Sequence, residues 1–186
     1  MKVLTSSIIL LGTLFTATAA QAEHQSVALG YAQSKIRGSG TLHGASLKYR
    51  YENEEISPWG IMGSATWMKG DDSFSYHDEM GQQSRDYATT YYSALVGPAL
   101  RVNDWMSLYA DMGIAHVDVD KTSHNETLQV TERHSHAYTS FAWGLGFIFN
   151  PTETITLNVG YEGTDADTYG DRSISSTFDF GVGYRF

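Results

Sequence analysis

Large apolar residues alternate with mostly small residues over the clearest window of the chain, residues 141–149. The odd positions are Phe, Trp, Leu, Phe and Phe, and the even positions are Ala, Gly, Gly and Ile. A period of two puts successive side chains on opposite faces of a β-strand, and helices do not produce it. Residues 155–162 and 177–186 repeat the pattern, and 27–34, 42–51, 59–68, 87–102 and 105–117 follow it more loosely. The pattern predicts an all-β chain of eight strands.

The predicted connections alternate in length. Residues 53–57, 103–104 and 150–154 are short and contain Asn with Asp, Ser or Pro, the residue types that tight turns favour. Residues 70–86, 118–135 and 164–172 are longer and strongly polar, so we predict loops there, whereas 35–40 is a short exception. Pro98 lies inside a predicted strand and cannot donate to the ladder, which predicts a bulge or a local break.

The two faces of the predicted strands differ in a way that indicates a membrane. One face carries large apolar residues with aromatics near the strand ends, and the other carries Gly, Ala, Ser and charged residues. This division suits a barrel with lipid outside and a small polar lumen, whereas bulky inward residues would favour a soluble, lipocalin-like barrel. The residues predicted to face lipid include Phe141, Trp143, Leu145, Phe147, Ile155, Leu157, Val159, Phe178, Phe180 and Val182.

Composition limits the remaining classes. The chain has 186 residues, no cysteine and a formal net charge of −9, which argues against disulfides, thiolate metal sites and a general nucleic-acid binder. Met1-Lys2, an apolar stretch and the small-x-small pattern at Ala20 to Ala22 are typical of a cleaved signal peptide. We therefore expect residues 1–22 to be the signal peptide and residues 23–186 to form one barrel domain.

Strand parity predicts a set of polar residues that point into the lumen. Because isolated charges are costly to bury, these groups should pair in a network that fills the narrow barrel and leaves no pore. A proton or ion path through them is the alternative, and the nearby arginines argue against carboxylates acting as a general acid. The predicted network consists of Lys48, Arg50, Arg101, Tyr109, Asp111, Glu162, Asp179 and Arg185.

Metal, cofactor and catalytic motifs are weak. His134-x-His136, with His116 and His124 nearby, could offer imidazoles to a metal, but histidines in a solvated polar loop are more often plain surface residues. Paired aspartates lack the glycine and glutamate spacing of a calcium loop, and no nucleophile elbow is present. We expect no metal, no cofactor and no enzymatic activity.

Several sequence runs, in order along the chain, are similar to one known family. The runs are Tyr31-Ala-Gln-Ser, Leu47-Lys-Tyr-Arg-Tyr-Glu, Gly97-Pro-Ala-Leu-Arg-Val-Asn-Asp-Trp, Phe149-Asn-Pro and Gly181-Val-Gly-Tyr-Arg-Phe. They resemble the OmpX/Ail/PagC/Lom family of enterobacterial outer-membrane proteins. The resemblance implies an eight-stranded antiparallel transmembrane β-barrel in the outer membrane of a Gram-negative bacterium, with short periplasmic turns and longer extracellular loops.

The same resemblance implies a surface protein for adhesion, invasion and serum resistance that binds host ligands through its loops. The alternative is a structural or stress-related envelope barrel without a specific ligand. Implied partners are outer-membrane lipid and lipopolysaccharide, the barrel-assembly machinery, and host extracellular-matrix or complement-regulator proteins, and we expect a monomer. The C-terminal Phe186 resembles the signal that the assembly machinery reads.

Alternation continues past the expected membrane edge, which suggests a binding surface. Val119 on one side of the loop, and Leu128 and Val130 on the other, predict that the fifth and sixth strands run on as a hairpin. Residues 70–86 should lie alongside, with Phe74 and Tyr76 as apolar anchors and an open strand edge for an extended partner. A mobile polar loop is the alternative.

Overall fold

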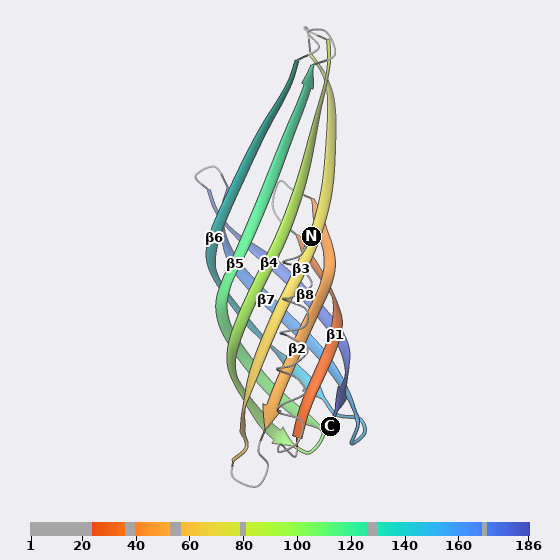
Figure 1. Ribbon diagram of the computed structural model, residues 1–186, viewed down its shortest axis with the longest axis vertical. Coiled ribbons are helices and arrows are strands. Elements are labelled where there is room, and N and C mark those ends of the chain that lie inside the picture. The colour runs from red at the N-terminus through yellow and green to blue at the C-terminus, as the bar shows by residue number, and fades with distance from the viewer. Residues whose placement is uncertain (1–23, 36–39, 53–56, 79–80, 126–129, 169–170) are drawn as a thin grey trace, which may run out of the picture.

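The computed structural model describes residues 24–35, 40–52, 57–78, 81–125, 130–168 and 171–186, and the expected signal peptide lies outside them. Eight strands close into one antiparallel barrel in sequence order (Figure 1). They are β1 (His24–Lys35), β2 (Thr41–Glu52), β3 (Trp59–Asp78), β4 (Gly81–Asn103), β5 (Met106–Asn125), β6 (Val130–Phe149), β7 (Ile155–Thr168) and β8 (Asp171–Arg185). No helix in this described part of the chain is long and apolar enough to cross a membrane.

The barrel closes between its first and last strands. β1 pairs with β8 from Ser26↔Arg185 to Lys35↔Ser176. Beyond the ladder, the Gln25 and Phe186 backbones exchange two hydrogen bonds, with N···O distances of 2.9 and 2.8 Å. Closure leaves no free edge over the height of the barrel, which is the condition for crossing a bilayer with strands.

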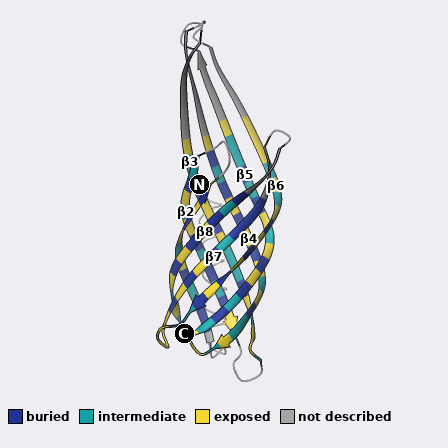
Figure 2. Ribbon diagram, turned by 180° about the vertical axis from the view of Figure 1, so that it is seen from behind, coloured by how far each residue is buried: buried dark blue, intermediate teal, exposed yellow. Residues whose placement is uncertain are grey.

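The alternation predicted from the sequence becomes an inside and an outside (Figure 2). The ten residues predicted to face lipid all point outward, with 38–63% of their surface exposed, which confirms the predicted orientation. Aromatic residues mark the upper and lower parts of the outer face. Trp59, Trp105 and Tyr184 lie toward the end where the chain finishes, and Tyr31 and Trp67 lie toward the opposite end. Such aromatic girdles are typical of barrels at the two membrane interfaces.

The short turns owe their geometry to side chains within them. Asn103 Oδ1 accepts a hydrogen bond from Trp105 N at 3.1 Å, and Thr152 Oγ1 accepts one from Ile155 N at 3.0 Å. Ser57 Oγ accepts from Trp59 N at 3.1 Å in the same way. These local bonds replace ladder bonds where the chain reverses, so the polar turn residues recognised in the sequence are explained.

Most of the polar residues expected to form long loops belong to strands, so that expectation is wrong. β3 continues to Asp78, β4 begins at Gly81, β5 reaches Asn125 and β6 starts at Val130, while β7 and β8 extend into 164–172. Figure 1 shows β3 to β6 rising well above the other strands. Most residues in these segments are polar, so the hydrophobic pattern is weak there, but backbone pairing between strands needs no apolar face. The predicted continuation of the fifth and sixth strands as a hairpin is confirmed, with pairing as far as Asn125↔Val130.

The local break predicted at Pro98 is also confirmed. Within the described β4–β5 ladder, Gly97 and Pro98 have no partner on β5, although pairing resumes in the same register at Ala99↔Tyr109. A Cβ on Gly97 would sit 2.0 Å from the carbonyl oxygen of Ala110, so the two backbones approach very closely there. Glycine at this position permits the approach, and Pro98 occupies the stretch where no donor is required.

Candidate functional site

The centre of the lumen holds an ion pair with an aromatic neighbour. Lys48 Nζ of β2 lies 2.6 Å from Asp179 Oδ1 of β8 and donates a hydrogen bond to the Tyr109 hydroxyl of β5 at 2.5 Å. The same Nζ is 4.8 Å from the centroid of the Tyr109 ring. All three residues are at least 93% buried. Three strands are thus joined across the lumen by charge-assisted contacts, which are strong where water is scarce.

Glycines on the facing strands make room for this group. A Cβ on Gly160 of β7 would lie 2.3 Å from Asp179 Oδ2, 2.4 Å from the Tyr109 hydroxyl and 2.6 Å from Lys48 Nζ. A Cβ on Gly146 of β6 would lie 2.5 Å from the same hydroxyl. The small residues seen in the sequence pattern therefore face the largest polar side chains across a narrow barrel.

A second polar group lies nearer the turn end and is built on Arg50. Its Nη1 is 3.3 Å from Glu52 Oε1 and donates to Ser107 Oγ at 3.0 Å. Its Nε donates to Ser26 Oγ, and its Nη2 donates to Asn150 Oδ1, both at 3.2 Å. Glu52 and Asn150 were not among the residues predicted for the lumen. Glu52 shares the parity of Lys48 and Arg50, so the alternation alone could have identified it.

The third polar group contains the carboxylates of Asp111 and Glu162. Ser64 Oγ donates to Asp111 Oδ2 at 2.8 Å. The Tyr91 hydroxyl donates to Glu162 Oε1, and Thr66 Oγ1 donates to Glu162 Oε2 at 3.2 Å. Both carboxylates are therefore held by hydroxyl donors rather than by an adjacent arginine, which differs from the pairing expected from the sequence.

The two remaining residues predicted for the network lie near the turn end. Arg101 and Arg185 are partly exposed. The Arg101 backbone N–H donates to the Pro58 carbonyl, and that of Arg185 donates to the Thr154 carbonyl, both at 2.8 Å. The structure therefore brings six of the eight predicted residues into the buried lumen and places these two arginines toward its rim.

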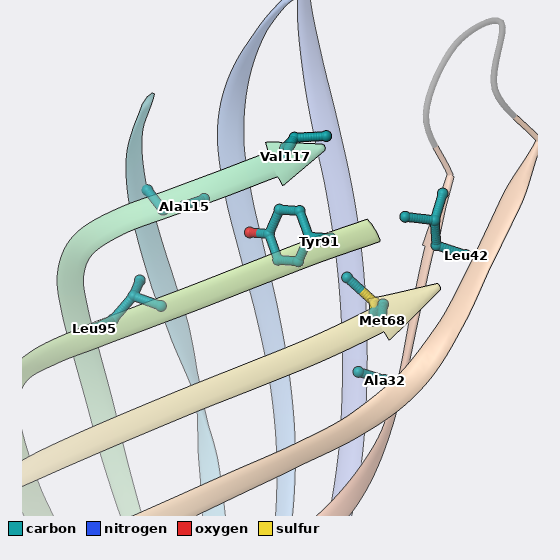
Figure 3. Close-up of a cluster of buried hydrophobic side chains, with 8 residues drawn as sticks. Ala32, Leu42, Met68, Tyr91, Leu95, Ala115 and Val117 are labelled. Atoms are coloured by element: carbon teal, nitrogen blue, oxygen red, sulfur yellow. The ribbon is translucent and has the colours of Figure 1, made fainter. Parts of the chain in front are cut away.

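The lumen is less polar than predicted, because two apolar clusters lie within it. The larger cluster is shown in Figure 3, where Leu42, Met68 and Tyr91 are its bulkiest members. It comprises Ala32, Leu42, Met68, Tyr91, Leu95, Ala115, Val117 and Ala142. The smaller cluster comprises Met62, Ala99, Tyr109 and Ile148. Large apolar residues also point inward, which corrects the expectation that only small and polar residues do so. These apolar residues have the same strand parity as the polar lumen residues. The alternation therefore predicts that they point inward, but it did not show how many large apolar residues the lumen contains.

Above the larger cluster, four strands continue as a sheet that we call the extension. It consists of the described parts of residues 70–89 and 119–136. Val119 and Tyr138 are partly buried against the larger cluster, so the base of this sheet is fixed to the barrel. β3 loses its β2 partner after Lys69, and β6 has no β7 partner before Ala142. Among the described residues, positions 70–78 of β3 and 130–141 of β6 thus have a backbone ladder partner on one side only. At the base of the β6 segment, the Thr164 side chain of β7 still bonds Ser140 Oγ at 2.9 Å and donates to the Phe141 carbonyl at 3.1 Å.

The residues predicted as a loop binding surface are distributed over this extension. Phe74 and Tyr76 lie on β3, in register with Arg85 and Gln83. Val119 lies on β5, Val130 begins β6, and Leu128 lies outside the described residues. Of this set, the structure describes only the Val119 side chain, and it packs inward on the apolar cluster.

The histidines considered as metal ligands form no cluster in the described part of the chain. His116 Nδ1 is 2.8 Å from Thr139 Oγ1, and its Nε2 is 3.4 Å from Asp118 Oδ1, on the exposed face of β5. No group of three or more potential ligands is present among the described residues. The side chains of His124 and His134 lie outside that part.

Comparison with known proteins gives consistent matches over nearly the whole chain. Residues 7–186 match the family described as outer membrane protein beta-barrel domain. The virulence membrane protein PagC of Salmonella typhimurium is 33% identical, covering all of this chain and 99% of that protein. Outer membrane protein X of Escherichia coli is 36% identical, covering 92% of this chain and 91% of that protein.

A solved structure shows the same arrangement of strands. The crystal structure of Ail, the attachment invasion locus protein of Yersinia pestis, is 30% identical and superposes with a TM-score of 0.70. The match covers 89% of this chain and all of that one. A second crystal structure of that protein, with a TM-score of 0.66, contains the heparin analogue sucrose octasulfate.

Proposed function

Because the chain belongs to the outer membrane protein β-barrel family that includes PagC, outer membrane protein X, Ail and Lom, we propose that it binds host ligands through its extension. It is an outer-membrane protein of the adhesion and virulence type, and it is not an enzyme. In bacterial barrels the short turns face the periplasm, so the turns after β2, β4 and β6 lie inside and the extension projects from the cell.

The observation that carries this proposal is the pair of one-sided strands in the extension. An unpaired edge presents a row of backbone N–H and C=O groups to which another extended segment can add. Main-chain hydrogen bonds then supply affinity, and side chains beside the edge supply selectivity. We propose residues 70–78 of β3 as the acceptor edge, with Phe74 and Tyr76 as anchors, because aromatic residues tend to dominate interfaces. Val130 belongs to the same proposed surface, whereas Val119 packs on the apolar cluster and fixes the base of the extension instead, and Leu128 lies outside the described residues.

The charge of the extension defines the chemistry of the partner. Residues 70–89 and 119–136 carry eight acidic residues, at positions 71, 72, 78, 79, 86, 120, 126 and 132, against three basic ones at 85, 121 and 133. An acidic surface attracts basic peptide segments and repels polyanions. The Ail structure with a heparin analogue shows that a relative accepts a polyanion, so this chain should differ from it in preferring basic, extended segments of host matrix or complement-regulator proteins.

The extension can be removed without disturbing the barrel below it. Asp71, Ala88, Asp120 and Ser135 occupy one continuous row across β3, β4, β5 and β6. Joining 71 to 88, and 120 to 135, each through an Asn-Gly turn, cuts all four strands at the same height and retains the pairing beneath. The shortened protein should stay folded and heat-modifiable while losing adhesion to host cells and survival in serum.

Two proline variants test whether adhesion requires backbone pairing at the β3 edge or only the presence of the extension. Backbone N–H groups of an edge strand point alternately toward the neighbour and toward solvent, so Ser73→Pro and Phe74→Pro remove donors on opposite sides of β3. One variant should weaken the hairpin, and the other should leave it intact but block the addition of a partner strand. Adhesion that persists in the shortened protein would instead support the structural envelope barrel without a specific ligand.

Assembly and partners in the membrane complete the proposal. We propose that Phe186 is read by the barrel-assembly machinery, because it ends an alternating strand with its side chain directed outward and stacked on Tyr184 at 6.2 Å. The mature barrel is proposed to work as a monomer surrounded by outer-membrane lipid and lipopolysaccharide.

A further inference from the structure

Negative charge exceeds positive charge inside the lumen. Among the described residues, six charged side chains are at least nine-tenths buried: Lys48, Arg50, Glu52, Asp111, Glu162 and Asp179. Two are cationic and four are anionic, an excess of two negative charges. Burying an uncompensated charge away from water is very unfavourable, so this imbalance needs a physical explanation.

The two cations each contact one of the anions. Lys48 pairs with Asp179, and Arg50 pairs with Glu52. Arg101 and Arg185 are too far along their strands to compensate the rest. Arg185 is eight residues, roughly 26 Å along β8, from Thr177, the register partner of Glu162. The register partner of Arg101 is four residues, roughly 14 Å, from Asp111 along β5.

The remaining carboxylates, Asp111 and Glu162, flank one glycine. Gly144 of β6 is the register partner of Asp111 on one side and of Glu162 on the other. A Cβ on Gly144 would lie 2.3 Å from Asp111 Oδ1, so this oxygen occupies the space that a side chain at 144 would fill. The glycine therefore makes room for the Asp111 carboxylate on the strand that separates it from Glu162.

Buried oxygens without partners lie on the same strands and on the strand next to Glu162. Asp111 Oδ1 and Thr177 Oγ1 have no hydrogen-bond partner among the described residues, and each side chain is at least 95% buried. Thr177 of β8 is the register partner of Glu162, so its free hydroxyl lies beside that carboxylate. Carboxylate and hydroxyl oxygens are the groups that hold a hard cation or share a proton.

We propose that the folded barrel binds one positive charge between Asp111 and Glu162, either as a shared proton or as a monovalent metal ion such as sodium. This charge halves the excess in the lumen, and folding of the barrel is coupled to its uptake. Other titratable groups facing the pair are Lys48 of β2, Tyr91 of β4, Tyr109 of β5 and Asp179 of β8. The described residues of β1, β3 and β6 contribute only uncharged side chains at this level.

Unfolding of the barrel measured against pH and sodium tests this proposal. The full-length mature barrel, reconstituted in phospholipid vesicles, is unfolded with urea from about pH 5 to about pH 9, in sodium chloride and in choline chloride of equal ionic strength. Asp111→Asn removes one member of the pair, and Glu162→Gln is the second variant if the first fails to fold. Glu52→Gln, at the Arg50 end of the lumen, is the matched control carboxylate.

The two sources of charge give different results. A proton retained by the folded state makes the unfolding constant rise by about tenfold per pH unit, because the unfolded chain releases it as pH increases. A sodium ion makes the unfolding constant fall by up to about tenfold for each tenfold increase in sodium, with no such effect of choline. Asp111→Asn should abolish whichever dependence is present, whereas Glu52→Gln should retain it. Wild type and Asp111→Asn with equal pH slopes and no response to sodium would overturn the proposal.

Discussion

Adding one methyl group at Gly160 should damage the lumen far more than adding one at Gly63. Both glycines lie in the interior of a strand, and neither has a positive φ, since Gly40 is the only described glycine in that region. Alanine is therefore compatible with the backbone at both positions. The two sites differ only in what the new Cβ meets.

The magnitude follows from the contacts at each position. At Gly160 the Cβ would meet Asp179, Tyr109 and Lys48 at 2.3 to 2.6 Å, distances that real Cβ atoms do not reach. These side chains must move and weaken the buried ion pair, and overpacking of this kind costs about 1–3 kcal/mol. At Gly63, on the outer face of β3, nothing lies within 4 Å. Alanine there should be neutral or stabilise by about 0.4–1 kcal/mol, through the unfolded chain.

Reversible urea unfolding in lipid vesicles measures both variants against the wild-type barrel. Tryptophan fluorescence follows the transition, and the gel shift of the folded barrel on heating checks that each variant inserts. The two variants should differ by about 1–4 kcal/mol, roughly fivefold or more in the unfolding constant. Equal stability of Gly160→Ala and Gly63→Ala would refute the view that glycines on β6 and β7 make room for the lumen ion pair.

Three further outcomes are expected. Leu157→Arg places a charge on the lipid-facing side of β7 and should lower the free energy of urea unfolding by about 2–4 kcal/mol near mid-membrane. Asn158→Ser on the lumen side should lower it only slightly, and similar losses in the two variants would contradict the orientation. Deletion of Phe186 should lower the amount of folded protein in isolated outer membranes, because it removes an aromatic residue and two backbone hydrogen bonds to β1. Normal amounts of the shortened protein would count against a role of Phe186 in assembly. Lys48→Met leaves Asp179 buried without its cation and should cost about 3–5 kcal/mol, and adding Asp179→Leu should restore much of the loss, as a double-mutant cycle would show.

The sequence alone determined how the membrane-spanning part of the barrel is arranged. Alternation at Phe141, Trp143 and Leu145 assigned an outward face, and the opposite parity assigned Lys48 and Glu162 to the lumen. Such assignments succeed because a strand has only two faces and a bilayer demands apolar side chains on one of them. The same pattern fixed the number of strands and the positions of the short turns.

The pairing of charges inside the lumen was decided by the tertiary structure. Parity says that Lys48 and Asp179 both point inward, but residues more than a hundred positions apart meet only because β8 closes onto β1. In the closed barrel, the carboxylates of Asp111 and Glu162 accept hydrogen bonds from hydroxyl groups and do not pair with arginines. Two lumen side chains can form a contact only if they lie at the same level along the barrel axis. That level depends on the register of all eight strands.

The extension likewise depended on tertiary structure. Residues 70–86 look like a loop because most of them are polar, and between 118 and 135 only Val119, Leu128 and Val130 carried an alternation that predicted strands. Their pairing is set by backbone hydrogen bonds and by neighbours that continue upward from the barrel, with Val119 and Tyr138 packed on the apolar cluster beneath. Hydrophobic alternation arises where one face of a strand contacts lipid. Above the membrane, the strands are maintained mainly by backbone hydrogen bonds to their neighbours, which the sequence pattern does not reveal.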